Sequence, residues 1–453
     1  MLHRGCSIYL ELVRFGGALA NVIIIVYTTL YRKGGAQFPI VAATLAREKR
    51  DSGFEGEIIS QAVESKRELL HIFREAKTSE NLIDEFHFVG HSGMYGPMFG
   101  TISFPEQFSP YEWETMEIPF ADGASAYFHC CRSARWFAPF FSRTFNVKTY
   151  GFFWYTTFSR NKTRYRFASP NNGTDTLYTI GCKGRKSHGL GASLLKFSGL
   201  MPSEEMKLFH PQAPAGDTSY NKVAALYDQA FADIKVRKDE WEWINRHLPD
   251  GKISVLDIGC GNGALLSALS ERIEYGAGVD KSGAILEKAR QRTSAKTNLQ
   301  FARISSPSIP FDDEKFDVII SMMSFRYLDW DPLMKEVKRV AKKGGIFLIV
   351  DMVTVPVRTT EYAKLIRDKF HTLFSQKTNS TFRGNLRRLV AHPDWKVMLK
   401  YNPIRSEHEM KWYLESRFPG RKMELLNLGW NARIVAFDSG PVENGVEVRL
   451  TYP

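Results

Sequence analysis

Val255–Gly263 has the sequence VLDIGCGNG, and this stretch decides the fold of the second half of the chain. An apolar strand runs directly into a turn with three glycines, and a helical pattern begins at Ala264. Glycine allows a sharp turn and lets a ligand approach the backbone without a Cβ in the way. The first turn of a helix also offers unpaired N–H groups. The stretch therefore predicts a small-ligand site where the strand ends.

Further strand-like segments alternate with helical patterns after this turn. They are Tyr275–Val279, Leu299–Ile304, Val318–Ser321 and Ile346–Val350. Such alternation predicts an α/β fold with a doubly wound parallel sheet. Asp280 follows the first of these strands, where a carboxylate can accept both hydroxyls of a ribose. The ligand is therefore expected to contain a ribose.

Landmarks in this half resemble the class I S-adenosylmethionine-dependent methyltransferases, from about Ser219 onward. They are VLDIGCGNG (255–263), GVD (278–280), IPFDDEKFDVIIS (309–321) and LMKEVKRVAKKGGIFLIVD (333–351). The GxGxG turn also differs from the GxGxxG of dinucleotide-binding folds. The resemblance implies S-adenosyl-L-methionine as the cofactor, a Rossmann-like domain, and methyl transfer to a small-molecule or peptidic acceptor. The Asn/Asp-Pro-Pro-aromatic signature of nucleic-acid amino methylases is absent, which disfavours base methylation, although an RNA-binding methyltransferase remains an alternative.

The resemblance also implies the cofactor-binding residues. Asp257, Gly259, Gly261 and Gly263 are implied to surround the methionine moiety, Asp280 to hold the ribose, and Met322 and Met323 to line the site. Cys260, Asn262 and Lys281 are further candidate cofactor-binding residues. Ser305 stands where the family often has an acid beside the adenine, so backbone groups are expected to make that contact. Tyr220 and Tyr227, in a predicted helix Tyr220–Trp243, either close over the cofactor or pack the helix onto the sheet.

Arg326 and Tyr327 are the candidate acceptor-site residues, since they follow the fourth strand of this sheet. They are expected to bind or deprotonate the acceptor. Methyl transfer is an in-line displacement at a sulfonium, in which the protein aligns the reacting atoms and excludes water. No metal is required for that reaction.

The N-terminal half contains two strands that end in chemically reactive residues. Phe86–Gly96 (FHFVGHSGMYG) contains His91 in a glycine-rich turn, and Ala126–Ala134 (AYFHCCRSA) contains Cys131. At the carboxyl edge of a parallel sheet, a His can accept the proton of a thiol, and the thiolate can attack a carbonyl. The pattern is not a serine hydrolase elbow, because Met94 replaces the last glycine of G-x-S-x-G.

Residues 22–159 resemble the caspase-like cysteine peptidases, with Val22–Thr28 as the first strand and a helix expected at Glu57–Glu75. The resemblance implies His91 as the general base and Cys131 as the nucleophile. Ser92 departs from the family, which usually has Gly after its His. Cys130 could also align, but adjacent strand residues point to opposite faces, so only one of the two thiols can react. A binding or regulatory scaffold is expected, with an active Cys/His peptidase as the alternative.

The chain has 453 residues and a net charge of +12, which suits two or three globular domains. His210–Asp217 predicts a linker between domains 1–209 and 218–453. The five cysteines show no zinc spacing and favour a reducing, cytoplasmic location. Phe15–Tyr31 is uncharged, but its β-branched centre favours a buried strand over a membrane helix.

The span Arg358–Lys422 has 15 basic and 6 acidic residues. Three interpretations remain open: a solvated helical face, recognition of an anionic acceptor by Arg383, Arg387 or Arg388, and a nucleic-acid or membrane contact. No nucleic-acid-binding motif accompanies the charge, so nucleic-acid and membrane partners are not expected.

Overall fold

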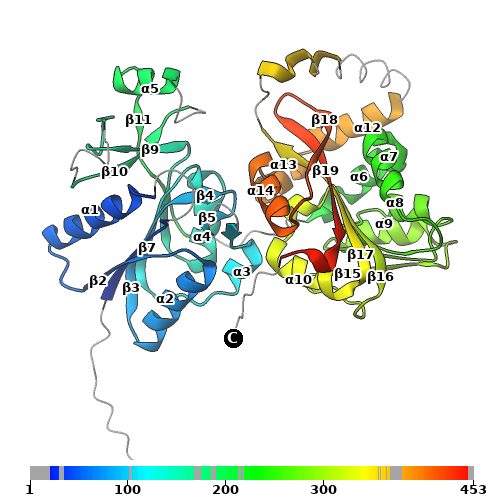
Figure 1. Cartoon of the computed structure of the whole chain (residues 1–453), viewed down its shortest axis with the longest axis horizontal. Helices are drawn as coiled ribbons and strands as arrows, with labels where there is room; N and C mark the ends of the chain where they lie inside the picture. Colours follow the sequence, from blue (N-terminus) through cyan, green and yellow to red (C-terminus); the bar gives the residue numbers. More distant parts are fainter. Residues whose placement is uncertain are drawn as a thin grey trace, which may run out of the picture.

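A computed structural model shows two α/β units joined by a short connection (Figure 1). The structure describes residues 21–29, 35–100, 105–167, 175–184, 190–212, 216, 219–355, 357, 359–363, 365–367 and 380–446. Cys6, Arg358 and parts of the predicted segments Phe15–Tyr31 and His210–Asp217 lie outside the described residues.

A six-stranded sheet forms the centre of the N-terminal unit, in the order β12-β8-β7-β3-β1-β2. Its strands are β1 (Asn21–Tyr27), β2 (Glu57–Ala62), β3 (Leu82–Val89), β7 (Phe120–His129), β8 (Lys148–Gly151) and β12 (Lys207–Phe209). The first five pair in parallel, and β12 is antiparallel to β8. In β1, Val22–Val26 are all buried, which confirms that the β-branched block is a central strand.

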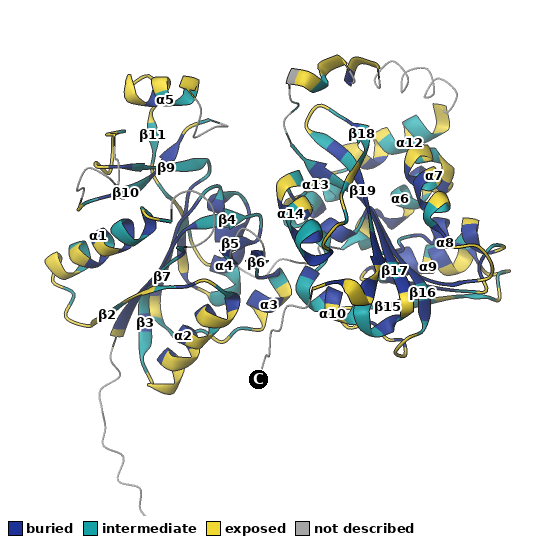
Figure 2. Cartoon of the chain, viewed as in Figure 1, coloured by how far each residue is buried: buried dark blue, intermediate teal, exposed yellow. Residues whose placement is uncertain are grey.

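Helices cover both faces of this sheet, so the unit has three layers (Figures 1 and 2). Helix α1 (Phe38–Asp51) packs on the face that presents Ile23 and Ile25. Helices α2 (Lys66–Thr78) and α4 (Phe137–Phe145) pack on the opposite face. Alternate residues of one strand therefore fill two separate apolar layers, as the side-chain period of a strand requires.

Smaller elements extend from both sides of the main sheet. Strands β4 (His91–Gly93), β5 (Gly96–Gly100) and β6 (Pro105–Gln107) form an antiparallel sheet, followed by the short helix α3 (Pro110–Glu114). Strands β9 (Tyr155–Ser159), β10 (Tyr178–Cys182) and β11 (Ser203–Glu204) form another, beside helix α5 (Leu190–Phe197). The first of these sheets begins at His91, directly after β3.

The C-terminal unit contains a seven-stranded sheet in the order β15-β14-β13-β16-β17-β19-β18. Its strands are β13 (Ser254–Ile258), β14 (Tyr275–Asp280), β15 (Leu299–Arg303), β16 (Phe316–Met322), β17 (Ala341–Thr354), β18 (Glu424–Leu428) and β19 (Ala432–Pro441). The first five are parallel, whereas β19 is antiparallel to both neighbours. Because β13 and β16 are central and adjacent, their carboxyl ends form the floor of one crevice.

Helices also cover both faces of the second sheet. One apolar layer lies under α10 (Trp330–Val340) and α14 (Glu407–Arg417), and the other lies under α7 (Lys238–His247) and α8 (Ala264–Leu269). The remaining helices are α6 (Ala224–Ala230), α9 (Gly283–Arg292), α12 (Ser380–Ala391) and α13 (Pro393–Tyr401), with short turns η3 (Tyr220–Val223), η4 (Ile234–Val236), η5 (Phe325–Tyr327) and η6 (Thr359–Glu361) among them. The mixed α/β class with a Rossmann-like second unit is thus confirmed.

Two predicted helices differ from the structure. The segment Glu57–Ala62 is strand β2, and the helix begins only at Lys66, where Ser65 accepts a hydrogen bond from Glu68 N–H. The predicted helix Tyr220–Trp243 is broken into η3, α6, η4 and α7. Asp233 causes one of these breaks, because its side chain accepts a hydrogen bond from Lys235 N–H and restarts the chain in a new turn.

Candidate functional site

The glycine turn lies at the carboxyl end of β13. Gly259, Gly261 and Gly263 have φ angles of +75°, +54° and +70°, in the region that disfavours side chains. A Cβ on Gly259 would stand 2.3 Å from Ser324 Cβ. Ser324 Oγ donates a hydrogen bond to the carbonyl of Ile258 at 2.6 Å and so fixes the start of the turn. Ser324 was not predicted as a site residue, since its partner, the Ile258 carbonyl, is 66 positions away in the sequence.

Two carboxyl groups lie at this turn, the buried Asp257 and the partly buried Asp280. Asp280 Oδ2 accepts a hydrogen bond from Gly261 N–H at 3.0 Å, and its Oδ1 accepts one from Ser282 N–H at 2.8 Å. Asp257 is buried, and its Oδ1 has no hydrogen-bond partner among the described residues. Burial, followed by the nearby Asp280 charge, raises the pKa of Asp257 to about 8. An unpartnered buried oxygen beside an open glycine turn fits a ligand with a cationic or hydrogen-bonding group.

Two tyrosines from the segment before α7 stand over the turn. The Tyr227 ring lies 3.5 Å from the point where a Cβ on Gly261 would be. Tyr220 packs edge-on against Tyr227, with ring centroids 5.3 Å apart, and against Trp395 of α13 at 5.9 Å. Helix α12 also contacts this segment, since Asn385 Nδ2 donates to the carbonyl of Gln229 at 2.8 Å. The insert after β17 therefore covers the same tyrosines.

Arg326 and Tyr327 lie in η5, directly after β16. The Arg326 guanidinium pairs with Asp351 on β17, and both side chains are buried. Although burial opposes its charge, Asp351 holds the pKa of Arg326 above its ordinary value, so Arg326 is a permanent cation and cannot accept a proton. Burial, and then the neighbouring Tyr327, raise the pKa of Tyr220 well above its ordinary value, so its hydroxyl remains protonated.

A family model described as a methyltransferase domain matches residues 256–349, from β13 to β17. The C-terminal half of the chain is an S-adenosylmethionine-dependent methyltransferase domain. The chain is 30% identical to the demethylmenaquinone methyltransferase of Lactococcus lactis, over 29% of this chain and 56% of that enzyme. It is also 34% identical to the uncharacterized protein MJ1252 of Methanocaldococcus jannaschii, over 28% of this chain and 48% of that protein. The chain thus spans about half the length of these curated relatives.

Among solved structures, an S-adenosylmethionine-dependent methyltransferase from Mesorhizobium loti aligns with a TM-score of 0.24. The two sequences are 26% identical over 26% of this chain and 58% of that chain. S-adenosylmethionine is the methyl donor of the methyltransferase domain. Its site fits that cofactor, since the Asp257 oxygen needs a partner and added Cβ atoms would fill the turn.

The other predicted cofactor residues differ in how close they lie to the crevice of the methyltransferase domain. Met322 and Met323 are buried at the end of β16, next to the crevice. Cys260 is buried, and Asn262 donates to Asp228 and to the Phe231 carbonyl rather than into the crevice. Lys281 and Ser305 are exposed. Their roles in cofactor binding stay predictions.

The basic span before β18 has both exposed and buried members. Arg387 and Arg388 are exposed on α12, whereas Arg405 is buried, with a side chain 2% accessible. Ser406 begins α14 with a capping box, as its sequence predicts. An anion-binding role for Arg383, Arg387 or Arg388 stays a prediction.

The predicted His/Cys pair of the N-terminal unit lies at one edge of its sheet. Val89 of β3 pairs with His129 of β7, and His91 and Cys131 each come two residues later. Ser92 Oγ donates a hydrogen bond to the carbonyl of Cys131, so these two loops touch. Cys131 is partly exposed, with its sulfur 3.2 Å from Thr156 Oγ1. Cys130 is buried, and burial raises the pKa of its thiol to about 12.

His87 and His129 form a buried pair of imidazoles beside this edge. His87 Nδ1 lies 3.1 Å from His129 Nε2, and His87 Nε2 lies 2.9 Å from Glu85 Oε2. Burial lowers the pKa of both imidazoles. The sequence does contain a sign of the Glu85–His87 contact. The two residues are two positions apart in one strand, so their side chains lie on the same face of the sheet.

No metal centre and no membrane-crossing helix were found in the part of the chain that the structure describes. No group of three His, Cys, Asp or Glu side chains has an arrangement that could hold a metal ion there. None of the described helices has the length and apolar content that a bilayer crossing needs.

Proposed function

We propose that the whole chain is a methyltransferase that transfers the methyl group of S-adenosylmethionine to a small-molecule or peptidic acceptor. One observation supports this most directly. Gly261 N–H donates a hydrogen bond to the partly buried Asp280 carboxylate, beneath the Tyr227 ring, and the unpartnered Asp257 oxygen lies at the same turn.

The proposed mechanism depends on positioning. Asp257 and the glycine turn would hold the methionine part of the cofactor, and Asp280 the ribose. The cofactor supplies an electrophilic methyl group, and displacement at that carbon needs alignment and exclusion of water. Tyr220 and Tyr227 exclude water from the crevice. Arg326 and Tyr327 are the candidate acceptor-side residues, and the Arg326 charge is balanced by Asp351 in a buried ion pair.

The proposed acceptor class is supported by the acceptor for which a similar enzyme is named. The similar enzyme from Lactococcus lactis is named for a small-molecule acceptor, demethylmenaquinone. Arg326 does not add to this argument, because its charge is balanced by the Asp351 carboxylate in a buried ion pair. RNA is the less favoured acceptor, because no RNA-binding sequence motif accompanies the exposed cations Arg387 and Arg388.

Calorimetry with S-adenosylhomocysteine tests the proposal without knowledge of the acceptor. We expect one site in the wild type and more than tenfold weaker binding in Asp280→Ala. Asp312→Ala is the matched control, because that carboxylate is 92% exposed in the same unit. A wild type that does not bind, or equal losses in both variants, would remove the proposal.

For the N-terminal unit, we propose a caspase-like scaffold with a binding or regulatory role. Its support is the sheet of five parallel strands with one antiparallel edge, and the contact between β4, which begins at His91, and the segment that contains Cys131. A peptidase also needs N–H groups that stabilise a negatively charged oxygen. At Gly93, beside His91, the Glu409 carboxylate is a close neighbour and would oppose such a charge. The described cysteines are free thiols, which suits a reducing cytoplasm.

A thiol-reactive peptide probe separates a scaffold from an active peptidase. The scaffold predicts no site-specific labelling of the full chain. Labelling that disappears in Cys131→Ala and persists in the matched variant Cys130→Ala would instead establish a nucleophile, since only Cys131 is partly exposed.

A further inference from the structure

The hairpin that begins at His91 inserts its tip into the methyltransferase domain. Met94 and Tyr95 form the tip between β4 and β5. Met94 N–H donates to Glu409 Oε1 at 2.5 Å, and Tyr95 Oη donates to the carbonyl of Arg326 at 3.4 Å. Tyr95 is 3% exposed, so its ring is fully enclosed by both units. The N-terminal unit therefore contacts the turn that contains the candidate acceptor residues.

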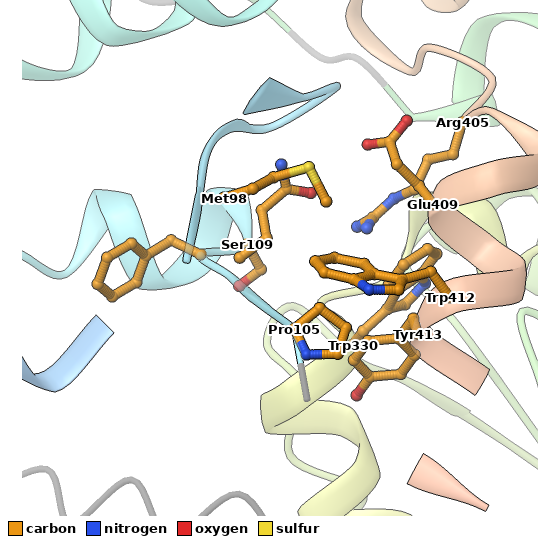
Figure 3. Close-up of a pocket in the computed structure, with 10 residues that line it drawn as sticks. Met98, Pro105, Ser109, Trp330, Arg405, Glu409, Trp412 and Tyr413 are labelled. Atoms are coloured by element: carbon orange, nitrogen blue, oxygen red, sulfur yellow. The ribbon is translucent and has the colours of Figure 1, made fainter. Parts of the chain in front are cut away.

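Arg405 connects the hairpin tip to that turn. Its guanidinium carbon lies 4.0 Å from the ring centroid of Tyr95 and 3.5 Å from that of Trp330. Its Nε donates to the carbonyl of Arg326 at 3.3 Å, and Nη2 donates to that of Leu328 at 3.2 Å. In Figure 3, Arg405 and Trp330 line one side of an interdomain cavity, and Met98 and Pro105 line the other. One buried cation thus fixes two carbonyls of the η5 turn.

The residue after Arg405 continues this chain of contacts. Ser406 and Glu409 form the capping box of α14, and Ser406 Oγ donates to Glu409 Oε2 at 2.7 Å. The other oxygen of Glu409 accepts the Met94 N–H. A shift of Arg405 therefore reaches the hairpin by two routes, through the Tyr95 ring and through the capping box.

The η5 turn is also connected to the cofactor crevice. Ser324, the N-cap of η5, donates a hydrogen bond to the Ile258 carbonyl at the start of the glycine turn, at 2.6 Å. Its own carbonyl accepts a hydrogen bond from Tyr327 N–H at 2.9 Å. Contacts thus run continuously from the glycine turn, through Ser324 and η5, to the hairpin tip.

We propose that Arg405 and Tyr95 are positioning residues of the methyl-transfer site, through which the N-terminal hairpin holds the Arg326–Tyr327 turn. The inference rests on the proposed methyltransferase function. It gives the N-terminal unit a defined regulatory contact: whatever displaces the hairpin also displaces the acceptor-side turn. Because such coupling is reciprocal, cofactor binding must also change the stability of the hairpin.

Hydrogen exchange of the full chain tests this inference, with S-adenosylhomocysteine as the probe. Exchange of an amide reports the local opening that frees it. We expect saturating ligand to slow exchange of the Met94 amide about fivefold or more, the lower range of typical couplings. In Arg405→Lys the ligand should still bind, but the slowing should fall below twofold, because lysine cannot stack on two rings and bond two carbonyls together.

Two further variants keep the test decisive. Tyr95→Phe removes only a hydroxyl, so the fold should persist while the slowing decreases by at least about half. Tyr111→Ala is the control, because Tyr111 lies in the same interface but contacts Asp329 through its backbone N–H. The inference would be overturned, and the proposed function kept, by either of two results. The ligand slows exchange of the Met94 amide as strongly in both Arg405→Lys and Tyr95→Phe as in the wild type, or it binds the wild type without slowing that exchange. A wild type that does not bind would remove the proposed function with it.

Discussion

Lys66 Nζ lies 2.7 Å from Asp331 Oδ2, and this ion pair joins two residues that are 265 positions apart in the chain. Lys66 also bonds Glu112 at 2.7 Å, and Asp331 also contacts Arg417 at 3.2 Å. All four side chains are at most 3% exposed. Two cations and two carboxylates thus balance inside the contact between the two units. Charges buried in this way favour one fixed docking arrangement over a mobile one.

Removal of Lys66 should strongly destabilise the chain. Lys66→Ala leaves the carboxylates of Asp331 and Glu112 buried with one cation fewer, and breaking a buried pair from one side typically costs about 3–5 kcal/mol. The free energy of unfolding from urea titration measures this loss.

The matched control is Lys77→Ala, which removes another lysine of α2. Lys77 pairs with Glu117, but its side chain is 56% exposed. Exposed pairs contribute about 0–1 kcal/mol, so little change is expected. Similar losses in the two variants would contradict a special role for the buried network.

Acid should weaken the same contact. Burial alone would raise the pKa of Asp331, but Lys66 and then Arg417 outweigh it and lower the pKa to about 2. A carboxyl with a depressed pKa stabilises the fold above its unfolded value, near pH 4, and loses that contribution as the pH falls through 2. We therefore expect unfolding free energy to fall between pH 4 and 2, and less steeply in Asp331→Asn. Equal slopes in both proteins would contradict this assignment.

The cofactor crevice could be predicted because its signals are local. Val255–Gly263 specifies a strand, a turn with positive φ and a helix start within nine residues, and Asp280 follows the adjacent strand. Buried parallel strands also consist of continuous apolar residues, so β13 and β16 could be predicted from their apolar segments.

The contacts between the units could not be predicted, because their partners are distant in sequence. Nothing in the sequence near Arg405 indicates that it lies between Tyr95 and Trp330. The basic span that contains it left a solvated helical face, an anionic acceptor and a nucleic-acid or membrane contact open. Strand β2 was missed for a related reason: Glu57–Ala62 is stabilised by pairing with β1, whereas its own residues have mixed polarity. At both places, contacts with residues distant in the sequence determine the structure, and local sequence patterns do not reveal them.

Alanine at Gly259 should disrupt the turn. The added Cβ would lie 2.3 Å from Ser324 Cβ, at a φ of +75°. The left-handed backbone costs about 1–2 kcal/mol and overpacking adds about 1–3 kcal/mol. We expect a loss of roughly 2–5 kcal/mol in unfolding free energy on these grounds, and loss of S-adenosylhomocysteine binding in calorimetry.

Gly251→Ala separates the two causes of that loss. Gly251 has a φ of +90°, but nothing lies within 4 Å of its added Cβ. It should therefore lose only the backbone cost of about 1–2 kcal/mol and retain binding. Loss of binding in this variant too would show that backbone strain, and not the Ser324 contact, determines the outcome.

Cofactor binding should release a proton from Asp257. Its pKa, about 8 without ligand, is raised by burial and then by Asp280, so most molecules are protonated there at pH 7. A cationic group bound beside it favours the carboxylate and lowers that pKa. Affinity for S-adenosylmethionine should therefore decrease as the pH falls from 8 to 6, by up to about tenfold per pH unit. For folding without ligand the sign is opposite, since a raised carboxyl pKa costs stability as the pH rises from 4 to 8.

Calorimetry at pH 7 in phosphate and in Tris measures the released proton, because the two buffers differ in their heat of protonation. The observed binding enthalpy should differ between buffers in the wild type. Asp257→Asn cannot ionise and should bind more weakly, with neither a buffer effect nor a pH dependence between 6 and 8. Asp312→Ala, an exposed carboxylate of the same unit, should behave as the wild type does. A wild-type enthalpy that is equal in both buffers would mean that Asp257 does not change its protonation on binding, and the cationic part of the cofactor would then have to lie elsewhere in the crevice.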